Sequence, residues 1–353
     1  SHLAAALAVD PGLVMGHALA GLMACLQARR SLDQAAARSL GAARTGLRLR
    51  GGTPREHAFI ASLAAWQEGG DMAQAALHLE QHLLTYPLDA AALKLAHGIR
   101  FMLGDSPGLR LPIERALPAW NDEMPHAGYI RGCHAFALEE TGDVWRAERV
   151  GRHAVAMQPA DLWGAHAVAH ALESSGRARE GIGWLDSVAR QMAGLGNFAR
   201  HIDWHRALFH LHLHEGEAAL ALYDSRVCDI LSEDYRDLAN AASLLWRMAA
   251  QGVPVGAARW DALADLAERR IGDHSLVFAD LHHVITLAAA GRAASLHAFL
   301  GGMRGRALRD TDTQARLHAS IGLPLAEGIA AALGGRPAGA LHLAPLLRRD
   351  LQR

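Results

Sequence analysis

Two stretches of this chain share one layout, HAFIASLAAWQEGGDMAQAALHLEQHLLTYP at 57–87 and YIRGCHAFALEETGDVWRAERVGRHAVAMQP at 129–159. Each stretch reads as a helix, a Gly-Asp turn, and a second helix that is closed by a proline. The proline follows the turn glycine by seventeen residues in both, as Pro87 follows Gly70 and Pro159 follows Gly142. Glycine permits the tight turn, and proline cannot continue a helix. The two stretches therefore predict antiparallel helix pairs that repeat along the chain.

The same layout extends in both directions, and it is that of the 34-residue tetratricopeptide repeat. Further helices are predicted at 13–29, 32–49, 88–104, 161–175, 178–192, 198–214 and 217–230. The segment 106–120 reads as irregular, with a short helix at most. We predict an all-α fold, a right-handed superhelix of tetratricopeptide-like antiparallel helix pairs, because each pair can bury its apolar faces only on its neighbours.

One domain is expected to span 1–353. Residues 1–230 carry the clearer repeats, and residues 231–353 carry degenerate helical pairs and a C-terminal cap. The cap is predicted as a final pair of helices, at 311–335 and 337–353.

Composition excludes several classes of partner. Lys+Arg 35 against Asp+Glu 36 leaves no electrostatic footprint for nucleic acid. No apolar run reaches the 18 residues of a membrane span. Three scattered cysteines form neither a disulfide framework nor a metal knuckle, which favours a reducing compartment. A cytoplasmic location is the default prediction.

The 22 histidines stand out in this composition. His166/His170 and His201/His205 are two His-x-x-x-His pairs, and four residues is about one helical turn, so each pair lies on one helix face. In the repeat frame both pairs fall on the first helix of a pair, here called an A helix, which lines the concave face. Adjacent A helices pack at about 8–10 Å, so the imidazoles of both pairs are expected to converge.

Several segments together resemble the tetratricopeptide repeat protein 38 family, in the same order over nearly the whole chain. They are VMGHALAG (14–21), ALKLAHGIRFMLGD (92–105), ADLWGAHAVAHALE (160–173), HIDWHRALFHLHLHEGEAALALYD (201–224), GVPVGAARW (252–260) and IGLPLAEGIAA (321–331). The resemblance implies a tetratricopeptide-type fold and no particular reaction. The family's polar and aromatic positions correspond here to His17, His97, His166, His170, Glu173, His201, Trp204, His205, Tyr223, Asp224, Asp280 and His282.

The chain departs from that family pattern at other positions. His134 stands where an aromatic residue is expected, and Arg206 stands where a tryptophan is expected. The remaining additional histidines are His126, His210, His212 and His214. These departures argue against the additional histidines as members of a common site.

The predicted function is that of a helical-repeat binding protein whose His-rich groove or pocket accepts a peptide, a protein segment or a small molecule. The groove residues are predicted to be His166, His170, Glu173, His201, Trp204, His205, Asp280 and His282. A divalent metal such as zinc or iron is a candidate cofactor, held by His166, His170, His201 and His205.

The alternative function is an enzyme that uses the same His/Glu cluster, either with a metal or by histidine acid–base catalysis. No HExxH, G-x-S-x-G or phosphate-loop motif supports a particular reaction. A structural role is also open, because a lone histidine in an apolar helix is typically a satisfied core residue. This applies to His57, His97, His153, His274, His297, His318 and His342. A homodimer through an exposed terminal face of the array is a further prediction.

Overall fold

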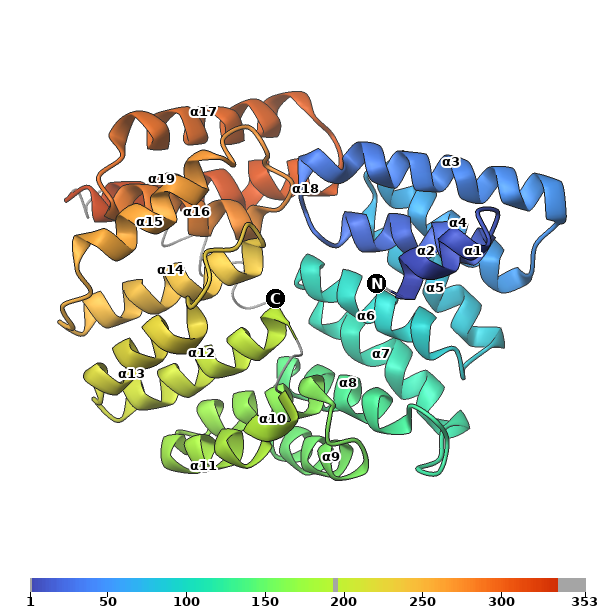
Figure 1. Cartoon of the computed structure of the whole chain (residues 1–353), viewed down its shortest axis with the longest axis horizontal. Helices are drawn as coiled ribbons and strands as arrows, with labels where there is room; N and C mark the ends of the chain where they lie inside the picture. Colours follow the sequence, from blue (N-terminus) through green and yellow to red (C-terminus); the bar gives the residue numbers. More distant parts are fainter. Residues whose placement is uncertain (1, 193–195, 336–353) are drawn as a thin grey trace. The chain divides into compact units, whose positions relative to one another are not determined.

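A computed structural model describes residues 2–192 and 196–335 of the chain, and its helical elements follow one another through both ranges (Figure 1). The contacts between Cα atoms divide the chain into two compact units, unit 1 (Ser1–Leu195) and unit 2 (Gly196–Arg353). The prediction of one domain over 1–353 stays a prediction, and each unit is described by itself. None of the helices in the two described ranges is both long enough and apolar enough to cross a membrane.

Unit 1 consists of helices joined by short turns. They are α1 (His2–Val9), α2 (Val14–Cys25), α3 (Asp33–Arg50), α4 (Pro54–Gln67), α5 (Met72–Thr85), α6 (Ala90–Leu103), α7 (Ser106–Ala116), α8 (Ala127–Glu140), α9 (Val144–Met157), α10 (Leu162–Ser174) and α11 (Ala178–Val188).

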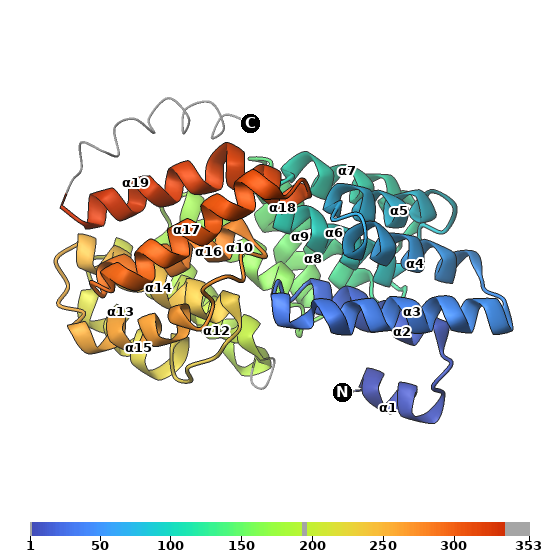
Figure 2. The ribbon, with the colours of Figure 1, turned by 90° about the horizontal axis from the view of Figure 1, so that it is seen from above.

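These helices pack as successive pairs. In sequence order, α2 packs on α3, α4 on α5, α8 on α9 and α10 on α11, and the A helices α8 and α10 also contact each other. Figure 2 shows α2 and α3 running side by side. The described part of the chain contains helices and no strand. The prediction of an all-α fold built from tetratricopeptide-like helix pairs is therefore confirmed.

Local sequence signals explain where these helices begin and end. Thr53 closes a capping box with Glu56 at the start of α4, and the Asp161 carboxylate accepts the backbone N–H of Gly164 at the start of α10. Such side chains satisfy backbone donors that the first helical turn leaves without partners. Gly142 adopts a φ of +83° between α8 and α9, a conformation that favours glycine over other residues.

The prediction of an irregular segment at 106–120 is wrong for its first eleven residues, which form α7. Asp105 caps this helix through the backbone N–H of Gly108, and Pro107 lies in the first turn, where a backbone donor is not needed. Leu109 and Ile113 are buried on one face, and α7 packs against α6 and α8. Pro112 lies inside the helix, so burial of this face outweighs the local cost of a proline.

Unit 2 continues the paired arrangement with less regular elements. They are α12 (Asn197–His212), α13 (Gly216–Leu222), a π-helical turn (Tyr223–Val227), α14 (Tyr235–Ala250), α15 (Ala257–Glu268), α16 (Val277–Ala289), α17 (Ala293–Arg309), α18 (Thr313–Leu317), a second π-helical turn (His318–Gly322) and α19 (Leu323–Leu333).

The helical pairs predicted beyond residue 232 match α14 with α15 and α16 with α17. The first half of the predicted C-terminal cap corresponds to α18 and α19. Its second half, 337–353, lies outside the described residues.

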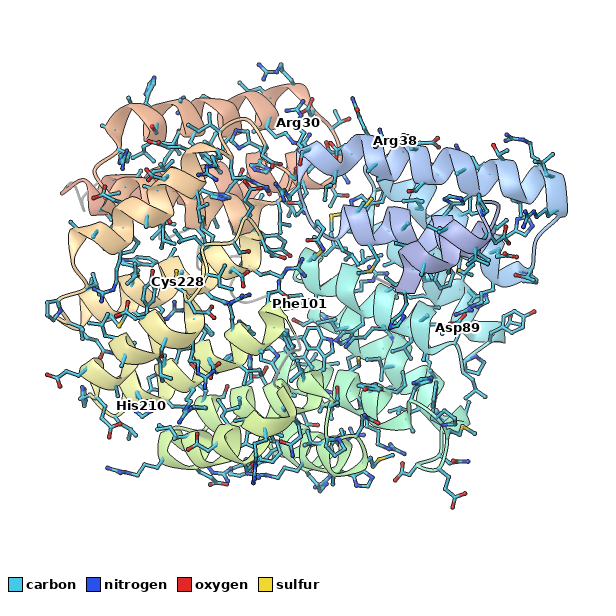
Figure 3. All side chains as sticks on the ribbon, viewed as in Figure 1. Arg30, Arg38, Asp89, Phe101, His210 and Cys228 are labelled. Carbon is cyan, nitrogen blue, oxygen red and sulfur yellow. The ribbon has the colours of Figure 1, made fainter. Side chains whose placement is uncertain are left out.

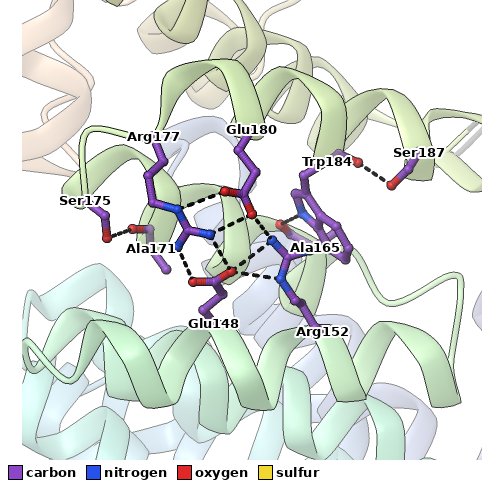
Figure 4. Close-up of polar contacts among 9 residues, drawn as sticks. All are labelled: Glu148, Arg152, Ala165, Ala171, Ser175, Arg177, Glu180, Trp184 and Ser187. Carbon is purple, nitrogen blue, oxygen red and sulfur yellow. Dashed lines mark hydrogen bonds and ion pairs between the residues drawn. The ribbon is translucent and has the colours of Figure 1, made fainter.

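Ion pairs on the outer surface of unit 1 join the B helices, the second helices of the pairs. Glu148 on α9 accepts from Arg152 on the same helix and from Arg177 at the start of α11 (Figure 4). Glu180 on α11 closes the network by accepting from both arginines. The Trp184 indole N–H donates to the carbonyl of Ala165 at 3.0 Å, which ties α11 to α10. The contact between Trp184 and Ala165 thus holds α11 against α10, the helix that carries the first histidine pair.

Replacing Gly151 by alanine is expected to destabilise unit 1. A Cβ at Gly151 would lie 2.7 Å from the Val168 side chain and 3.0 Å from the Gly164 carbonyl oxygen, so α9 and α10 would have to separate. Overpacking of this kind costs about 1–3 kcal/mol, which exceeds the gain of about 1 kcal/mol in helix propensity. Urea denaturation measures the difference.

The matched control is Gly183→Ala in α11, where no atom lies within 4 Å of the added Cβ. This variant is expected to gain up to about 1 kcal/mol, since only helix propensity changes. Equal effects of the two substitutions would contradict close packing at Gly151.

Candidate functional site

The first histidine pair lies on α10 in unit 1, and its two rings contact each other. Nε2 of His166 and Nε2 of His170 are 2.8 Å apart. His166 is buried, with 2% of its surface exposed, whereas His170 is half-buried. Two ring nitrogens at this distance share a proton in a hydrogen bond, because two lone pairs would repel each other.

The outer nitrogen of His170 faces a carboxylate on the neighbouring A helix. Nδ1 of His170 donates to Oε2 of Glu139 on α8 at 3.1 Å. Burial lowers the pKa of His170, but the hydrogen bond to Glu139 and the negative charges of Glu140 and Glu173 outweigh burial, so the pKa is raised overall. A carboxylate behind an imidazole fixes the ring orientation and makes its other nitrogen more basic.

The carboxylates beside the pair extend the candidate site within unit 1. Ligand atoms of Glu139, Glu140 and His170 lie within 4.8 Å of one another. Burial and the charge of Glu139 raise the pKa of Glu140. Glu173 was predicted as a groove residue; its charge acts on His170 from three residues along the same helix, and its groove role stays a prediction. Sequence reasoning missed Glu139 and Glu140, because the only signal was their place at the end of the preceding A helix.

Aromatic side chains surround the buried side of the first pair. The Phe136 ring stacks on His166, with 5.3 Å between ring centroids, and Trp163 lies 4.7 Å from Phe136. His97 on α6 contacts both of these aromatic rings and is buried. Burial lowers the pKa of His97 well below its usual value. His97 is therefore a neutral member of an aromatic wall that contributes no charge to the site.

The second histidine pair lies on α12 in unit 2, and a neighbouring A helix holds it as well. Nδ1 of His201 donates to the side-chain oxygen of Asn240 on α14 at 2.8 Å, which places the lone pair of a neutral His201 on Nε2. His205 is buried, and its ring lies 4.8 Å from that of His201. Trp204 stacks on His201 and donates its indole N–H to Ser243.

The two histidine pairs thus share one arrangement. In each, one imidazole gives its Nδ1 hydrogen to an oxygen on a neighbouring A helix, the preceding one for α10 and the following one for α12, and the second imidazole lies one turn away. The pairs belong to different units, so their expected convergence stays a prediction.

Asp280 and His282 lie on α16 in unit 2 and have different surroundings. Oδ2 of Asp280 is buried and accepts from His274 Nδ1 and His318 Nε2, both at 2.8 Å. His282 donates Nδ1 to the carbonyl of Phe278 in its own helix. The predicted role of both residues in a ligand groove stays a prediction, and the contacts of Asp280 are those of a core residue.

His318 has acceptors at both ring nitrogens, since its Nδ1 is 2.7 Å from the Gln314 carbonyl oxygen. Nδ1 therefore donates a hydrogen bond to the Gln314 carbonyl, and another proton lies in the hydrogen bond between Nε2 and Asp280. His274 is six residues from Asp280, but His318 is 38 residues away, and no spacing rule predicts the cluster.

A groove of about 1120 Å³ lies elsewhere in unit 1, and none of the predicted groove residues lines it. It is formed by the first turns of α4, α6 and α8 and by the loop between α5 and α6. The sequence reasoning did not anticipate it.

No family model matches the chain. Among solved structures, it is similar to human IFIT1, in a dimer with PPP-AAAA, at 14% identity and a TM-score of 0.43, over 90% of this chain and 87% of that one. It is also similar to the Naa15/Naa10 structure bound to HypK-THB, at 13% identity and a TM-score of 0.31, over 99% of this chain and 60% of that one. These likenesses concern the fold alone. Membership of the tetratricopeptide repeat protein 38 family stays a proposal.

Removing the carboxylate of Asp280 is expected to destabilise unit 2 strongly. Burial raises the pKa of Asp280, but the bonds from His274 and His318 outweigh burial, so the pKa is lowered. Asp280→Asn leaves two buried imidazoles without their anion and should cost about 3–5 kcal/mol in urea denaturation at pH 7.

The pH dependence follows from the lowered pKa of Asp280. A lowered pKa stabilises the fold above the pKa of the unfolded carboxyl, about 3.9, and this contribution is lost as pH falls through the folded value. The difference between wild type and Asp280→Asn should therefore shrink in acid. The control is Asp261→Asn, which removes an exposed carboxylate paired with Arg292 and should cost less than about 1 kcal/mol. A loss for Asp280→Asn as small as that of the control would contradict a charged buried cluster.

Proposed function

We propose that this chain is a helical-repeat binding protein whose ligand-binding residues are paired histidines, those of α10 in unit 1 and those of α12 in unit 2. A divalent transition metal, zinc or iron, is the group that the imidazoles hold, and a peptide or small molecule binds beside it on the A-helix face. The observation that carries this proposal is the Glu139–His170–His166 arrangement in unit 1.

The geometry of that arrangement suits metal ligation. The carboxylate of Glu139 takes the Nδ1 hydrogen of His170, so Nε2 presents a lone pair toward His166. Metal-ligating histidines commonly donate their other nitrogen to a carboxylate or carbonyl in this way. A metal ion bound at about 2.0–2.1 Å from each Nε2 would take the place of the shared proton, and tetrahedral ligation would require the two nitrogens to move apart to about 3.3–3.4 Å.

Carboxylates near the pair offer additional oxygen ligands. Glu140 on α8 and Glu173 on α10 both act electrostatically on His170. Two imidazoles and a carboxylate form a donor set that zinc and non-haem iron accept. Because such a set leaves coordination positions open, a ligand group can bind the ion directly.

The second pair supports the same function from unit 2. Asn240 orients His201 as Glu139 orients His170, although a neutral amide supplies the oxygen. Trp204 stacks on His201, and its ring lies 5.5 Å from the Arg247 guanidinium carbon. The resemblance to the tetratricopeptide repeat protein 38 family includes both pairs, Glu173 and Trp204, and it implies no reaction.

Enzymatic acid–base chemistry is the second candidate, and the pKa shifts favour it. The pKa values of both His170 and Glu140 are raised, and raised carboxyl values are a feature of general acids near neutral pH. The metal-dependent and the acid–base function can be distinguished, because an acid–base site keeps its activity after a chelator removes metal and a metal-dependent site loses it.

Elemental analysis tests the metal proposal. Protein purified without chelator and then supplied with zinc or iron(II) is expected to retain stoichiometric metal after desalting. The double variant His166→Ala/His170→Ala should lose it, because two of its ligands are gone. The exposed His57→Ala variant is the matched control and should retain it. Absence of bound metal from the wild type after loading would refute the metal proposal.

The variant His201→Ala/His205→Ala distinguishes one ion from two. If each double variant loses the same single equivalent, both pairs hold one ion. If each loses a separate equivalent, every unit holds its own. Circular dichroism and melting temperature confirm that the variants fold, and His170→Ala alone is expected to lose ligand with only a modest change in melting temperature.

Metal affinity is expected to fall as pH decreases through the raised pKa of His170. Protons compete with the metal for imidazole nitrogen, and the acids around His170 strengthen proton binding. Glu139→Gln should shift the midpoint of this pH dependence to lower pH, because the amide no longer stabilises the imidazolium. An unchanged midpoint in this variant would mean that Glu139 does not set the basicity of the site.

A further inference from the structure

Lysine occurs once in this chain. Of the 35 Lys and Arg residues, Lys94 is the single lysine, and every other one is arginine. The two side chains differ physically, because lysine ends in a compact ammonium with three donors and arginine ends in a wide planar fork. Lys94 therefore supplies the one side-chain ammonium among 34 guanidinium groups.

Lys94 lies on α6 in unit 1, half-buried, and its ammonium contacts neutral groups. Nζ is 3.3 Å from Sγ of Cys133 and 4.3 Å from the centroid of the Trp163 ring. Burial raises the pKa of Cys133, so the group stays a thiol. Within residues 2–192 and 196–335, Lys94 makes no ion pair with a carboxylate. A partly buried cation without a counter-ion is costly, and an anionic ligand would relieve that cost.

The Asp161 carboxyl group interacts electrostatically with Lys94. It does not provide a full negative counter-charge for the Lys94 ammonium. Asp161 is buried, with 1% of its surface exposed, and it caps α10. Burial raises its pKa to about 7, which outweighs the attraction of Lys94 and the backbone N–H groups of Gly164 and Trp163. Much of Asp161 is therefore protonated near neutral pH.

Lys94 also lines the groove of about 1120 Å³ in unit 1, and the other charges there leave the wall positive. Arg55 is the second cation of this wall. Asp89, labelled in Figure 3, is the acid of the wall, and it already accepts from Arg55, His82 and the backbone N–H of Ala92. Nη1 of Arg55 takes no part in that pairing and stays available. One acid against two cations leaves an excess of positive charge.

The rest of the groove is apolar or aromatic. Tyr86 stacks on His82 with 4.8 Å between ring centroids, and Tyr129 lies 6.4 Å from His126. Leu88 and several alanines and prolines complete the wall. Pockets of about 300–1,000 Å³ accept small molecules, and a few polar groups among apolar ones set their orientation. The groove thus has room for one small ligand with a flat apolar body.

We propose that this groove is a binding site for a small organic anion, a carboxylate or phosphate monoester on an apolar or aromatic body, with Lys94 as its anchoring cation. Neither His166 nor His170 lines the groove, and Trp163 lies between Lys94 and His166. The proposal does not depend on metal binding at the histidine pairs.

Dye titration tests the proposal with two matched probes. The fluorescent anion 1-anilinonaphthalene-8-sulfonate is expected to bind the wild type at one site. The neutral analogue N-phenyl-1-naphthylamine has the same aromatic body without the charge, and it should bind at least about tenfold more weakly, which corresponds to about 1.4 kcal/mol. Equal affinity for the two dyes would overturn the proposal.

Lys94→Met removes the charge and keeps most of the apolar stem. It is expected to weaken the anionic dye about tenfold or more and to change binding of the neutral dye by less than about twofold. Arg38→Gln, on the exposed face of α3 and labelled in Figure 3, is the control and should bind both dyes as the wild type does. Unchanged binding of the anionic dye by Lys94→Met would overturn the proposal.

Two competitors identify the head group. Phenyl phosphate and phenylacetate present a phosphate monoester and a carboxylate on the same aromatic ring. Displacement of the anionic dye by one of them assigns the anion, and displacement by neither overturns the proposal.

The wild type also allows a test that needs no variant. Because Lys94 is the single lysine, its acetylation by an N-hydroxysuccinimide ester can be followed by mass spectrometry of one peptide, with the α-amine as internal reference. Saturating phenyl phosphate or phenylacetate should slow acetylation of Lys94 at least about fivefold and leave the α-amine rate unchanged. An unaltered rate at Lys94 would overturn the proposal.

Discussion

Close approach of α8, α9 and α10 is the constraint on which the first candidate site depends. Gly151 of α9 lies against Val168 and the backbone of Gly164 on α10, and a Cβ there would lie 2.7 Å from the Val168 side chain. Gly132 of α8 likewise has no room for a side chain beside Asp161. Because these helices meet through glycine, α8 and α10 are near enough for Glu139 to reach His170. If α8 and α10 lay further apart, the Glu139 carboxylate would not reach the His170 imidazole.

Pairing of histidine with an oxygen acceptor recurs through both units, with different consequences. In the core of unit 2, Asp280 accepts from two imidazoles and every member is buried, so the cluster stabilises packing. On α10 and α12 the acceptor holds only one imidazole of each pair, and a second imidazole lies one turn away. The two imidazoles around one oxygen mark the structural cluster, whereas each candidate pair keeps one half-buried imidazole, His170 or His201, beside a buried one.

Much of the fold was predictable, because its signals are local. Gly142 and Pro159 mark a turn and a helix end through backbone geometry that any chain with those residues would share. The segment 106–120 was predicted to hold a short helix at most, and the full length of α7 was missed, since Pro112 argues against a helix locally and burial of Ile113 supports it only in the folded unit. The His pairs were found by spacing on one helix, but Glu139 required knowledge of which helix packs beside α10.

The sequence by itself determined the helix pairs, the turns that join them and the histidine stripes on two A helices, because these depend on periodicity and backbone preference within a few residues. Tertiary structure decided which oxygens meet those histidines and that Asp280 is a core anion. It also placed Lys94 on the wall of a groove, with no carboxylate partner among the described residues 2–192 and 196–335. Most of those outcomes depend on contacts between residues more than thirty positions apart, such as His170 with Glu139 and His318 with Asp280. Such contacts are set by how helices pack, and no spacing along the chain encodes them.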